Sequence, residues 1–271
     1  MVLKIEKKGS RLYLTLNRPE RGNSLDPPTL FQLREEVLKA QEEEEIKVIV
    51  LTGTGERDFC TGLDVGIAKK LSLGNKINLA NIAGDIATTI YWGKPTVVGI
   101  NGRAMGMGLV FSAAADYRVC VKDAVLQMPE VRSGIFPGAS CIAIMGKICG
   151  ISATKRMLMV GESFSPEEGT RYNLIDEILE REAVEKRVNK VAKKFARSND
   201  VLLRSIKTAC NSAAYLDYNA MLSLESKLAG WPLWTQPQNN LKSHLKYYKL
   251  KAELTGDVDR LEREYQEILK D

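Results

Sequence analysis

The sequence contains few of the side chains on which metal binding and nucleophilic catalysis most often depend. Its single histidine, His244, lies in a segment rich in lysine and tyrosine near the C-terminus. One isolated histidine argues against a Ser-His-Asp or Cys-His mechanism and against a histidine-rich metal site. We therefore expect His244 to be a solvated side chain, and we expect no metal site.

A paired cysteine pattern and long apolar runs are also absent. The cysteines are Cys60, Cys120, Cys141, Cys149 and Cys210, an odd set without CxxC spacing. The N-terminal residues lack the apolar core of a secretion signal, and no uninterrupted apolar run approaches the roughly 18 residues that a membrane span needs. These absences predict a reduced, cytoplasmic protein that makes no membrane contact.

The chain carries no strong charge of one sign. It has 39 basic and 34 acidic residues, which are mixed along its length and give a net charge of +5. This mild field predicts no nucleic-acid partner, although it is compatible with a small polyanionic ligand. One helix face is either a solvated surface or an anion contact, and it is formed by Lys186, Lys190, Lys193, Lys194 and Arg197.

An alternation of strand and helix patterns is present and is typical of an α/β domain. Strand patterns cover residues 2–6, 11–16, 46–52, 96–101, 117–121, 125–127 and 173–179. Helical patterns begin at Asp26, precede Trp92, and recur at 107–115, 139–148, 151–160 and 182–198. No glycine run carries a third fingerprint glycine or a GK[ST] sequence, so neither a dinucleotide fingerprint nor a P-loop is supported. The later residues are only helical, which divides the chain into a core, 1–198, and a C-terminal helical region, 199–271.

The segment 95–116 is the most informative part of the chain. Its β-branched residues 96–100 predict a buried strand, and its small residues from Ser112 predict a closely packed helix. Gly106 and Gly108 lie between them and permit backbone conformations closed to other residues. A turn of this kind can direct free backbone N–H groups at a ligand.

Several motifs follow one another along the first 180 residues. They are Leu14-Thr-Leu-Asn-Arg-Pro19 with Asn23, Val48–Gly53, Phe59-Cys-Thr-Gly-Leu-Asp64, Lys94-Pro95 through to Asp116, Pro129-Glu130 to Pro137-Gly138, and Ser165-Pro-Glu-Glu168 to Leu174. Each motif alone is weak, but all of them in this order and at this spacing are specific. Together they make the chain resemble the crotonase, or enoyl-CoA hydratase/isomerase, superfamily. The resemblance implies an α/β fold with a spiral of ββα units, followed by C-terminal helices that build trimer contacts in a homotrimer or a dimer of trimers.

The resemblance also implies an acyl-CoA thioester as substrate, with coenzyme A as part of that substrate and no separate cofactor. In this family two backbone N–H groups polarise the thioester carbonyl. The matching motifs place one at Leu63, after Thr61 and Gly62, and the other at Met107, after Gly106. The family usually has glycine where Met107 stands, but a main-chain donor depends on backbone geometry rather than on the side chain.

Two glutamates usually hydrate an enoyl thioester in this family, and this sequence keeps one of them. Glu130 matches the glutamate of the Pro-Glu loop, whereas Val110 occupies the position on the central helix. A single carboxylate suits the shift of a double bond from C3–C4 to C2–C3, because one group can remove a proton at C2 and return it at C4. We expect apolar neighbours to raise the pKa of Glu130, namely Val110, Phe111, Ile135 and Phe136.

Further contacts follow from the same resemblance. Arg21, just after the Asn-Arg-Pro motif, and Arg57, just before the Phe-x-x-Gly loop, are candidates for contact with the phosphates of coenzyme A; otherwise each is a solvated arginine. Backbone groups near Gly138 would hold a water molecule if the enzyme hydrates its substrate. Asp64 and Asp116 are expected to be structural.

These features favour a Δ3,Δ2-enoyl-CoA isomerase in which Glu130 shuttles one proton. One alternative is a hydratase that adds water to a 2-enoyl-CoA. Another is a non-catalytic member that binds acyl-CoA or serves as a scaffold. For Glu130 itself, the structural alternative is a surface acid paired with Arg132 or Arg103.

Overall fold

The structure is a computed structural model that describes residues 1–64, 66–67 and 79–235 of the 271. It divides into one compact unit, Met1–Ala214, and a second that begins at Tyr215. In the second unit the described part includes helix α10, Tyr218–Thr235. His244 lies outside the described residues. The predicted division at residue 198 stays a prediction.

A six-stranded sheet forms the centre of the first unit, with the strand order β1-β2-β3-β5-β7-β10. Its strands are β1 Leu3–Lys8, β2 Arg11–Leu16, β3 Val48–Gly53, β5 Thr96–Ile100, β7 Tyr117–Val121 and β10 Glu177–Leu179. β1 and β2 form an antiparallel hairpin, and the neighbours from β2 onward pair in parallel. Because each parallel neighbour needs a crossover connection, helices cover the sheet and its central strands are buried.

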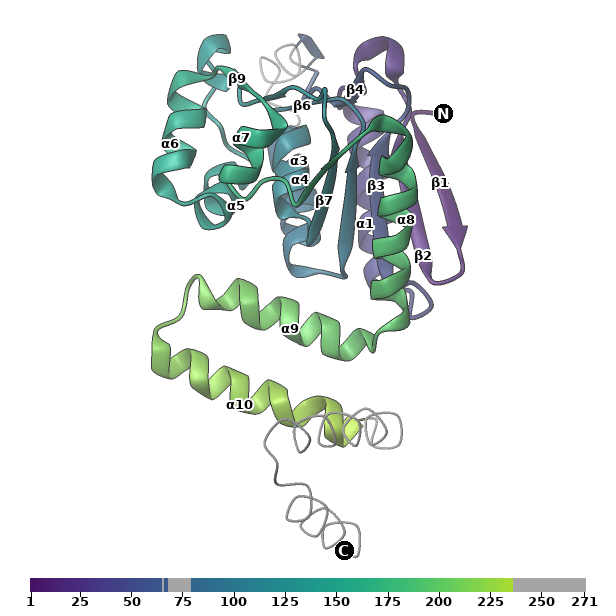
Figure 1. The fold of residues 1–271 in the computed structure, drawn as a ribbon, viewed down its shortest axis with the longest axis vertical. Helices are drawn as coiled ribbons and strands as arrows, with labels where there is room; N and C mark the ends of the chain where they lie inside the picture. Colours follow the sequence, from purple (N-terminus) through teal and green to yellow (C-terminus); the bar gives the residue numbers. More distant parts are fainter. Residues whose placement is uncertain (65, 68–78, 236–271) are drawn as a thin grey trace, which may run out of the picture. The chain divides into compact units, whose positions relative to one another are not determined.

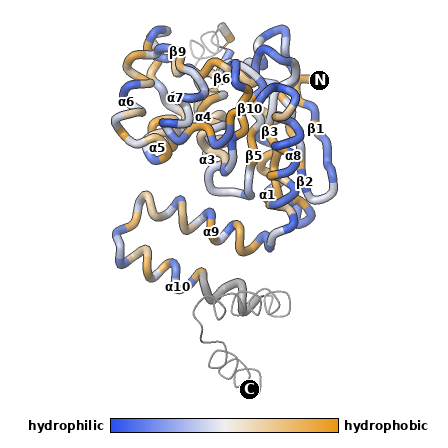
Figure 2. The backbone as a smooth tube through the Cα atoms, viewed as in Figure 1, coloured by the Kyte–Doolittle hydropathy of each residue, from blue (hydrophilic) through white to orange (hydrophobic). Residues whose placement is uncertain are grey.

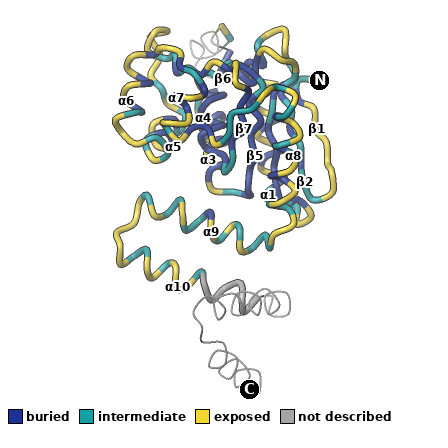
Figure 3. The backbone as a smooth tube through the Cα atoms, viewed as in Figure 1, coloured by how far each residue is buried: buried dark blue, intermediate teal, exposed yellow. Residues whose placement is uncertain are grey.

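Helices pack on both faces of this sheet (Figure 1). α1, Pro27–Glu42, packs on β1 and β2 and against α3, Leu79–Trp92, whereas α8, Arg181–Arg197, contacts β3, β5 and β7. Figure 2 shows hydrophobic residues gathered in β3 and β5, and Figure 3 shows the same strands buried. Within the described ranges, no helix has both the length and the apolarity needed to cross a membrane.

A second, smaller sheet has the order β4-β6-β8-β9. Its strands are β4 Asp58–Cys60, β6 Arg103–Met105, β8 Leu126–Gln127 and β9 Ser163–Phe164. β4, β6 and β8 directly follow β3, β5 and β7, so that a long strand, a short strand and then helical chain recur along the sequence. This repeat confirms the expected α/β fold built from a spiral of ββα units.

The remaining helices are α4 Met107–Ala114, α5 Cys141–Ile148, α6 Ile151–Val160, α7 Pro166–Arg171 and α9 Asp200–Ala213. Of these, α9 lies below the strand ends of the first sheet in Figure 1, and α4 contacts α3, α5 and the second sheet. α7 begins with a capping box, in which Ser165 and Glu168 bond each other reciprocally and Pro166 occupies the first helical position. Asn173 lies just after this helix and has a φ of 59°, a conformation typical of the residue that follows a helix.

Candidate functional site

The glycine turn between β6 and α4 lies against the loop that follows β4. Gly106 has φ 51° and ψ −123°, a conformation that favours glycine, and its N–H donates to the carbonyl of Gln127 at 3.0 Å. A Cβ on Gly62 would come within 2.9 Å of the Met105 oxygen and 3.2 Å of the Met107 nitrogen. Both glycines are therefore needed for the two loops to approach each other.

This approach brings two uncommitted backbone donors together. Leu63 forms a parallel bridge with Leu25, in which the Leu25 N–H donates to Gly62 at 2.8 Å and the Asp64 N–H donates to Leu25 at 3.0 Å. The N–H of Leu63 itself therefore points away from this bridge. Met107 is the first residue of α4, so its N–H precedes the first intrahelical bond. Within the described part of the chain, neither N–H donates to a protein acceptor, which leaves both free to bind an oxyanion.

Glu130 places a carboxylate beside the same turn. It is the first residue of the 3-10 helix η2, Glu130–Ser133. A Cβ on Gly106 would lie 2.8 Å from its Oε1 atom. Its Oε2 atom is buried and has no hydrogen-bond partner among the described residues. Burial raises the pKa of Glu130 above its ordinary value of 4.5, which suits a group that accepts a proton during the reaction.

The surface-pair alternative for Glu130 does not fit the structure. Arg103 donates its Nε–H to Asp58, and Arg132 lies 3.6 Å from Glu162. Both arginines therefore have carboxylate partners of their own. The pKa shift of Glu130 has burial as its main cause, opposed only by a hydrogen bond from its own backbone.

Of the four apolar residues expected around Glu130, two are buried. Val110 and Phe111 are fully buried in α4, so the helix position of the second family glutamate contributes no charge. Ile135 and Phe136, in contrast, are 38% and 79% exposed. They line a separate apolar hollow of about 520 Å³ beside α5 and α6. That Ile135 and Phe136 desolvate Glu130 stays a prediction, whereas the predicted direction of its pKa shift agrees with the structure.

The chain beyond η2 is strained where it enters α5. Ala139 and Ser140 are consecutive non-glycine residues with φ values of 56° and 61°. Gly84 of α3 allows this turn to pack closely, because a Cβ there would come within 3.1 Å of the Ala139 Cα. Strain of this kind is often found near functional sites. Gly138 precedes the turn and is exposed, but its N–H already donates to Phe136 at 2.9 Å.

The loop carrying Arg21 is fixed to the Leu63 loop. The backbone N–H and the Oγ1 hydroxyl of Thr61 both donate to the carbonyl of Gly22 at 3.1 Å. Arg21 lies 3.5 Å from Asp64, the residue after Leu63, and its side chain is 61% exposed. Asp64 therefore has the structural role that the sequence suggested, and it holds a cation next to one of the two free amides.

Arg57 lies outside this cluster, at the start of β4. Its side chain is 80% exposed and its Nε is 3.9 Å from Asp58, which is itself buried and bonded to Arg103. The ion pair between Asp58 and Arg103 joins β4 to β6 beneath the two loops. The sequence interpretation missed this pair. The two charged residues could have been recognised in the sequence, because each lies in a short segment that otherwise has the composition of a glycine-rich loop.

The chain is similar to proteins that act on coenzyme A thioesters. A family model described as enoyl-CoA hydratase/isomerase matches residues 6–251. A similar protein is the (E)-benzylidenesuccinyl-CoA hydratase of Thauera aromatica, 32% identical over 212 residues that cover 77% of this chain and 82% of that protein. The crotonyl-CoA hydratase of Syntrophomonas wolfei is 25% identical over 235 residues, covering 86% of this chain and 90% of that protein. The crystal structure of an enoyl-CoA hydratase from Bacillus anthracis has the same fold, with a TM-score of 0.84 and 23% identity over 91% of this chain and 96% of that one.

Proposed function

The chain belongs to the enoyl-CoA hydratase/isomerase family, and we propose that within this family it catalyses the reversible addition of water to a 2-enoyl-CoA, with Glu130 as its acid and base. Hydration is favoured over the isomerisation that the sequence suggested, because the similar proteins named above are hydratases. The observation that carries the proposal is the placement of the Glu130 carboxylate against Gly106, one residue before the free N–H of Met107.

The two free amides would hold the thioester oxygen of the substrate. As electrons move onto that oxygen, the Leu63 and Met107 N–H groups stabilise the developing negative charge. The positive end of the α4 dipole acts at the same point, because Met107 opens that helix. Removing one donor of this kind costs about 3–4 kcal/mol of transition-state stabilisation in well-studied enzymes.

Glu130 would then act first as a base toward water and afterwards as an acid toward C2. Its carboxylate takes a proton from water as the water oxygen bonds to C3, and the π electrons move through C2 to the thioester oxygen. The protonated Glu130 next returns a proton to C2 as the carbonyl re-forms. One carboxylate thereby adds water across the double bond without the second acid that Val110 replaces.

Isomerisation is a second candidate because Val110 is fully buried and carries no charge. In this reaction Glu130 removes a proton from C2 of a 3-enoyl-CoA, the two amides hold the resulting enolate, and the proton returns at C4. The chemistry needs no bound water, so it makes no use of a second carboxylate.

A direct test compares the two reactions in the wild type and two variants. Crotonyl-CoA loses its conjugated absorbance on hydration, whereas a 3-enoyl-CoA gains it on isomerisation. We expect Glu130→Gln to reduce the dominant reaction by roughly 10²–10⁴-fold. Glu162→Gln, which changes an exposed glutamate paired with Arg132, should leave it unchanged. Full activity of Glu130→Gln in both assays would show that the catalytic assignment is wrong, and tight binding of acyl-CoA without turnover by the wild type would favour a scaffold.

We propose Arg21 rather than Arg57 as the contact for the coenzyme A phosphates, because Asp64 holds Arg21 beside the Leu63 amide. Arg21→Ala should then raise KM for an enoyl-CoA more than for the matching pantetheine thioester, which lacks the nucleotide phosphates. Thr61 and Gly62 act in this proposal by positioning the Leu63 loop. A homotrimer or a dimer of trimers belongs to the same proposal, and sedimentation equilibrium tests it.

A further inference from the structure

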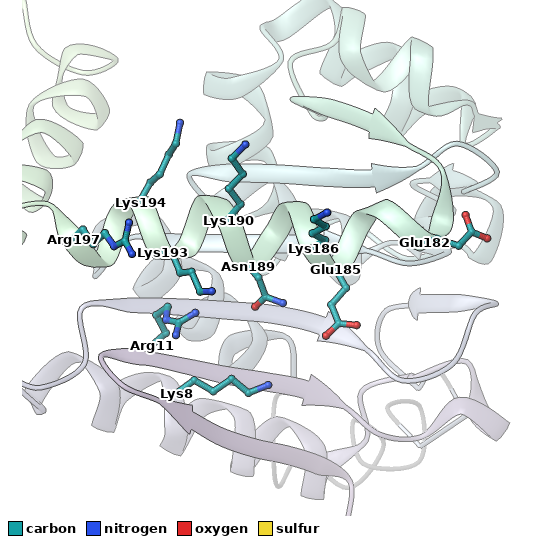
Figure 4. Close-up of a pocket in the computed structure, with 10 residues that line it drawn as sticks. All are labelled: Lys8, Arg11, Glu182, Glu185, Lys186, Asn189, Lys190, Lys193, Lys194 and Arg197. Atoms are coloured by element: carbon teal, nitrogen blue, oxygen red, sulfur yellow. The ribbon is translucent and has the colours of Figure 1, made fainter.

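A second concave region lies between α8 and the hairpin formed by β1 and β2 (Figure 4). This hollow, the α8 groove, has a volume of about 800 Å³ and shares no lining residue with the Glu130 site. Such a volume is in the range typical of small-molecule sites, roughly 300–1,000 Å³. Figure 4 shows Lys193 extending from α8 toward the strands that carry Lys8 and Arg11.

The lining of the α8 groove is strongly basic. Seven of its side chains are lysine or arginine and two are glutamate, a local net charge of +5. This equals the net charge of the whole 271-residue chain, so the rest of the protein is neutral in sum. Both glutamates, Glu182 and Glu185, lie near the start of α8, whereas the cations continue to its end.

Among the described residues, the basic side chains of α8 that line the groove lack the carboxylate partners that the other basic side chains of α8 have. Arg181 lies 2.7 Å from Asp123, and Arg187 donates to Glu177. In the described part of the chain, five groove cations have neither an ion pair nor a hydrogen bond to the protein. They are Lys186, Lys190, Lys193, Lys194 and Arg197. The carboxylates of the fold therefore neutralise the flanks of α8 and leave its groove side charged.

The fold does not require this row of charges. α8 is anchored through Val184, Val188 and Val191, which are buried against the sheet. Lys186, Lys190 and Lys193 recur at intervals of four and three residues on the exposed side, where like charges repel each other. The row up to Arg197 extends about 16 Å at 1.5 Å per residue. A ligand with several negative charges along its length would relieve this repulsion.

We propose that the α8 groove binds a small molecule that carries several adjacent phosphate groups. Lysine ammonium groups bind phosphate as point charges and demand no fixed geometry. Base stacking is not part of this recognition, because Lys8 and Arg11 already lie over the Tyr13 ring, 4.8 and 5.8 Å from its centre. A concave site of this size also suits a compact ligand better than a flat membrane surface.

Titration of the full chain with inorganic tripolyphosphate, followed by calorimetry, tests this proposal. We expect one site per chain and an affinity that falls steeply with added salt. The Lys190→Glu/Lys193→Glu variant should bind at least ten-fold more weakly. The control variant Lys4→Glu/Lys155→Glu makes the same change in net charge at two exposed lysines outside the groove, and it should bind as the wild type does. Both variants should retain the basal enoyl-CoA activity, which separates this proposal from that of the Glu130 site.

Three results would overturn the proposal. The wild type could fail to bind tripolyphosphate, the two variants could lose affinity equally, or binding could be confined to other sources of the same phosphate chemistry. A single-stranded oligonucleotide and vesicles containing phosphatidylinositol bisphosphate represent those sources. If either binds to the groove while tripolyphosphate does not, the partner is a polymer or a membrane rather than a small molecule.

Discussion

The Glu130 carboxylate lies directly against Gly106, so that a Cβ on this glycine would come within 2.8 Å of Oε1. Real Cβ atoms do not approach other atoms so closely. Gly106 also has a φ of 51° and precedes Met107, whose N–H is one of the two free amides. One residue without a side chain therefore sets the spacing between the proposed base and the proposed oxyanion donor.

We predict that Gly106→Ala reduces kcat/KM by ten-fold or more, because the methyl group must displace the Glu130 carboxylate. The positive φ at Gly106 adds about 1–3 kcal/mol of destabilisation for a residue with a side chain, which urea unfolding measures. Gly9→Ala is a matched control, since Gly9 has a φ of 59°, has nothing within 4 Å of its Cβ position, and lies in the β1–β2 hairpin. It should lose stability but keep its activity. Equal losses of activity in the two variants would contradict a steric role for Gly106.

The raised pKa of Glu130 predicts the pH dependence of the reaction. A base acts in its ionised form, so the acid limb of kcat/KM should lie above pH 4.5, the ordinary value for glutamate. Glu130→Gln should remove this limb from any residual activity. A limb at or below pH 4.5 would show that the carboxylate is solvated in the working enzyme.

The same shift predicts how stability depends on pH. A carboxyl group whose pKa is raised by folding stabilises the folded state below its unfolded pKa, and this contribution is lost as pH rises through the folded pKa. The Oε2 atom of Glu130 is buried and has no partner among the described residues, so the ionised carboxylate should destabilise the protein near neutrality. Glu130→Gln should therefore be more stable than the wild type at pH 8 and equal to it near pH 4. Denaturant unfolding at the two pH values measures the difference.

Val110→Glu tests whether the second family glutamate belongs at this position. Val110 is fully buried, so the variant should lose several kcal/mol of stability. We nevertheless expect the ratio of hydration to isomerisation to rise, because a second carboxylate can position water opposite Glu130. Val110→Gln has similar volume and no charge, and it should not raise the ratio. An unchanged ratio in folded Val110→Glu would show that residue 110 does not face the reacting carbons.

The longer elements could be predicted from the sequence because their patterns are local. β2 alternates buried and half-buried residues over its six positions, and β5 is a continuous buried run. β4 and β6 were missed, because three residues are too few to show a period of two. Pairing between them fixes their conformation instead, and this pairing joins residues far apart in the sequence.

The sequence motifs identified the residues of the candidate site, but they did not show which neighbouring residues are exposed. Motifs identified Glu130, Leu63 and Met107, and the structure brings their loops together. The exposure of Phe136 could not be inferred, since an apolar side chain close to Glu130 in the sequence was expected to be buried. The chain turns at Gly134, which has a φ of 64°, and the residues after it line a separate hollow.

An ion pair between buried Lys207 and half-buried Asp116 holds α9 against the end of the central sheet. Lys207 Nζ lies 2.8 Å from Asp116 Oδ2 and donates to the carbonyl of Ile90 at 2.6 Å. The same Asp116 oxygen accepts the N–H of Thr96 at 2.7 Å, so one carboxylate joins β5, the end of α4 and α9. The sequence suggested that Asp116 is structural, and these contacts agree with that role.

Lys207→Met should therefore destabilise the protein by about 3 kcal/mol, the lower end for a buried pair, because it leaves the half-buried Asp116 carboxylate without its cation. Combining it with Asp116→Asn removes the stranded charge, so the double variant should lose less stability than the sum of the two single variants. Lys155→Met, at an exposed lysine of α6, should change stability by no more than about 0.5 kcal/mol. Urea unfolding of the four variants measures the coupling. If the losses from Lys207→Met and Asp116→Asn simply add, the ion pair contributes nothing beyond its separate hydrogen bonds, and the packing of α9 must come from its apolar contacts.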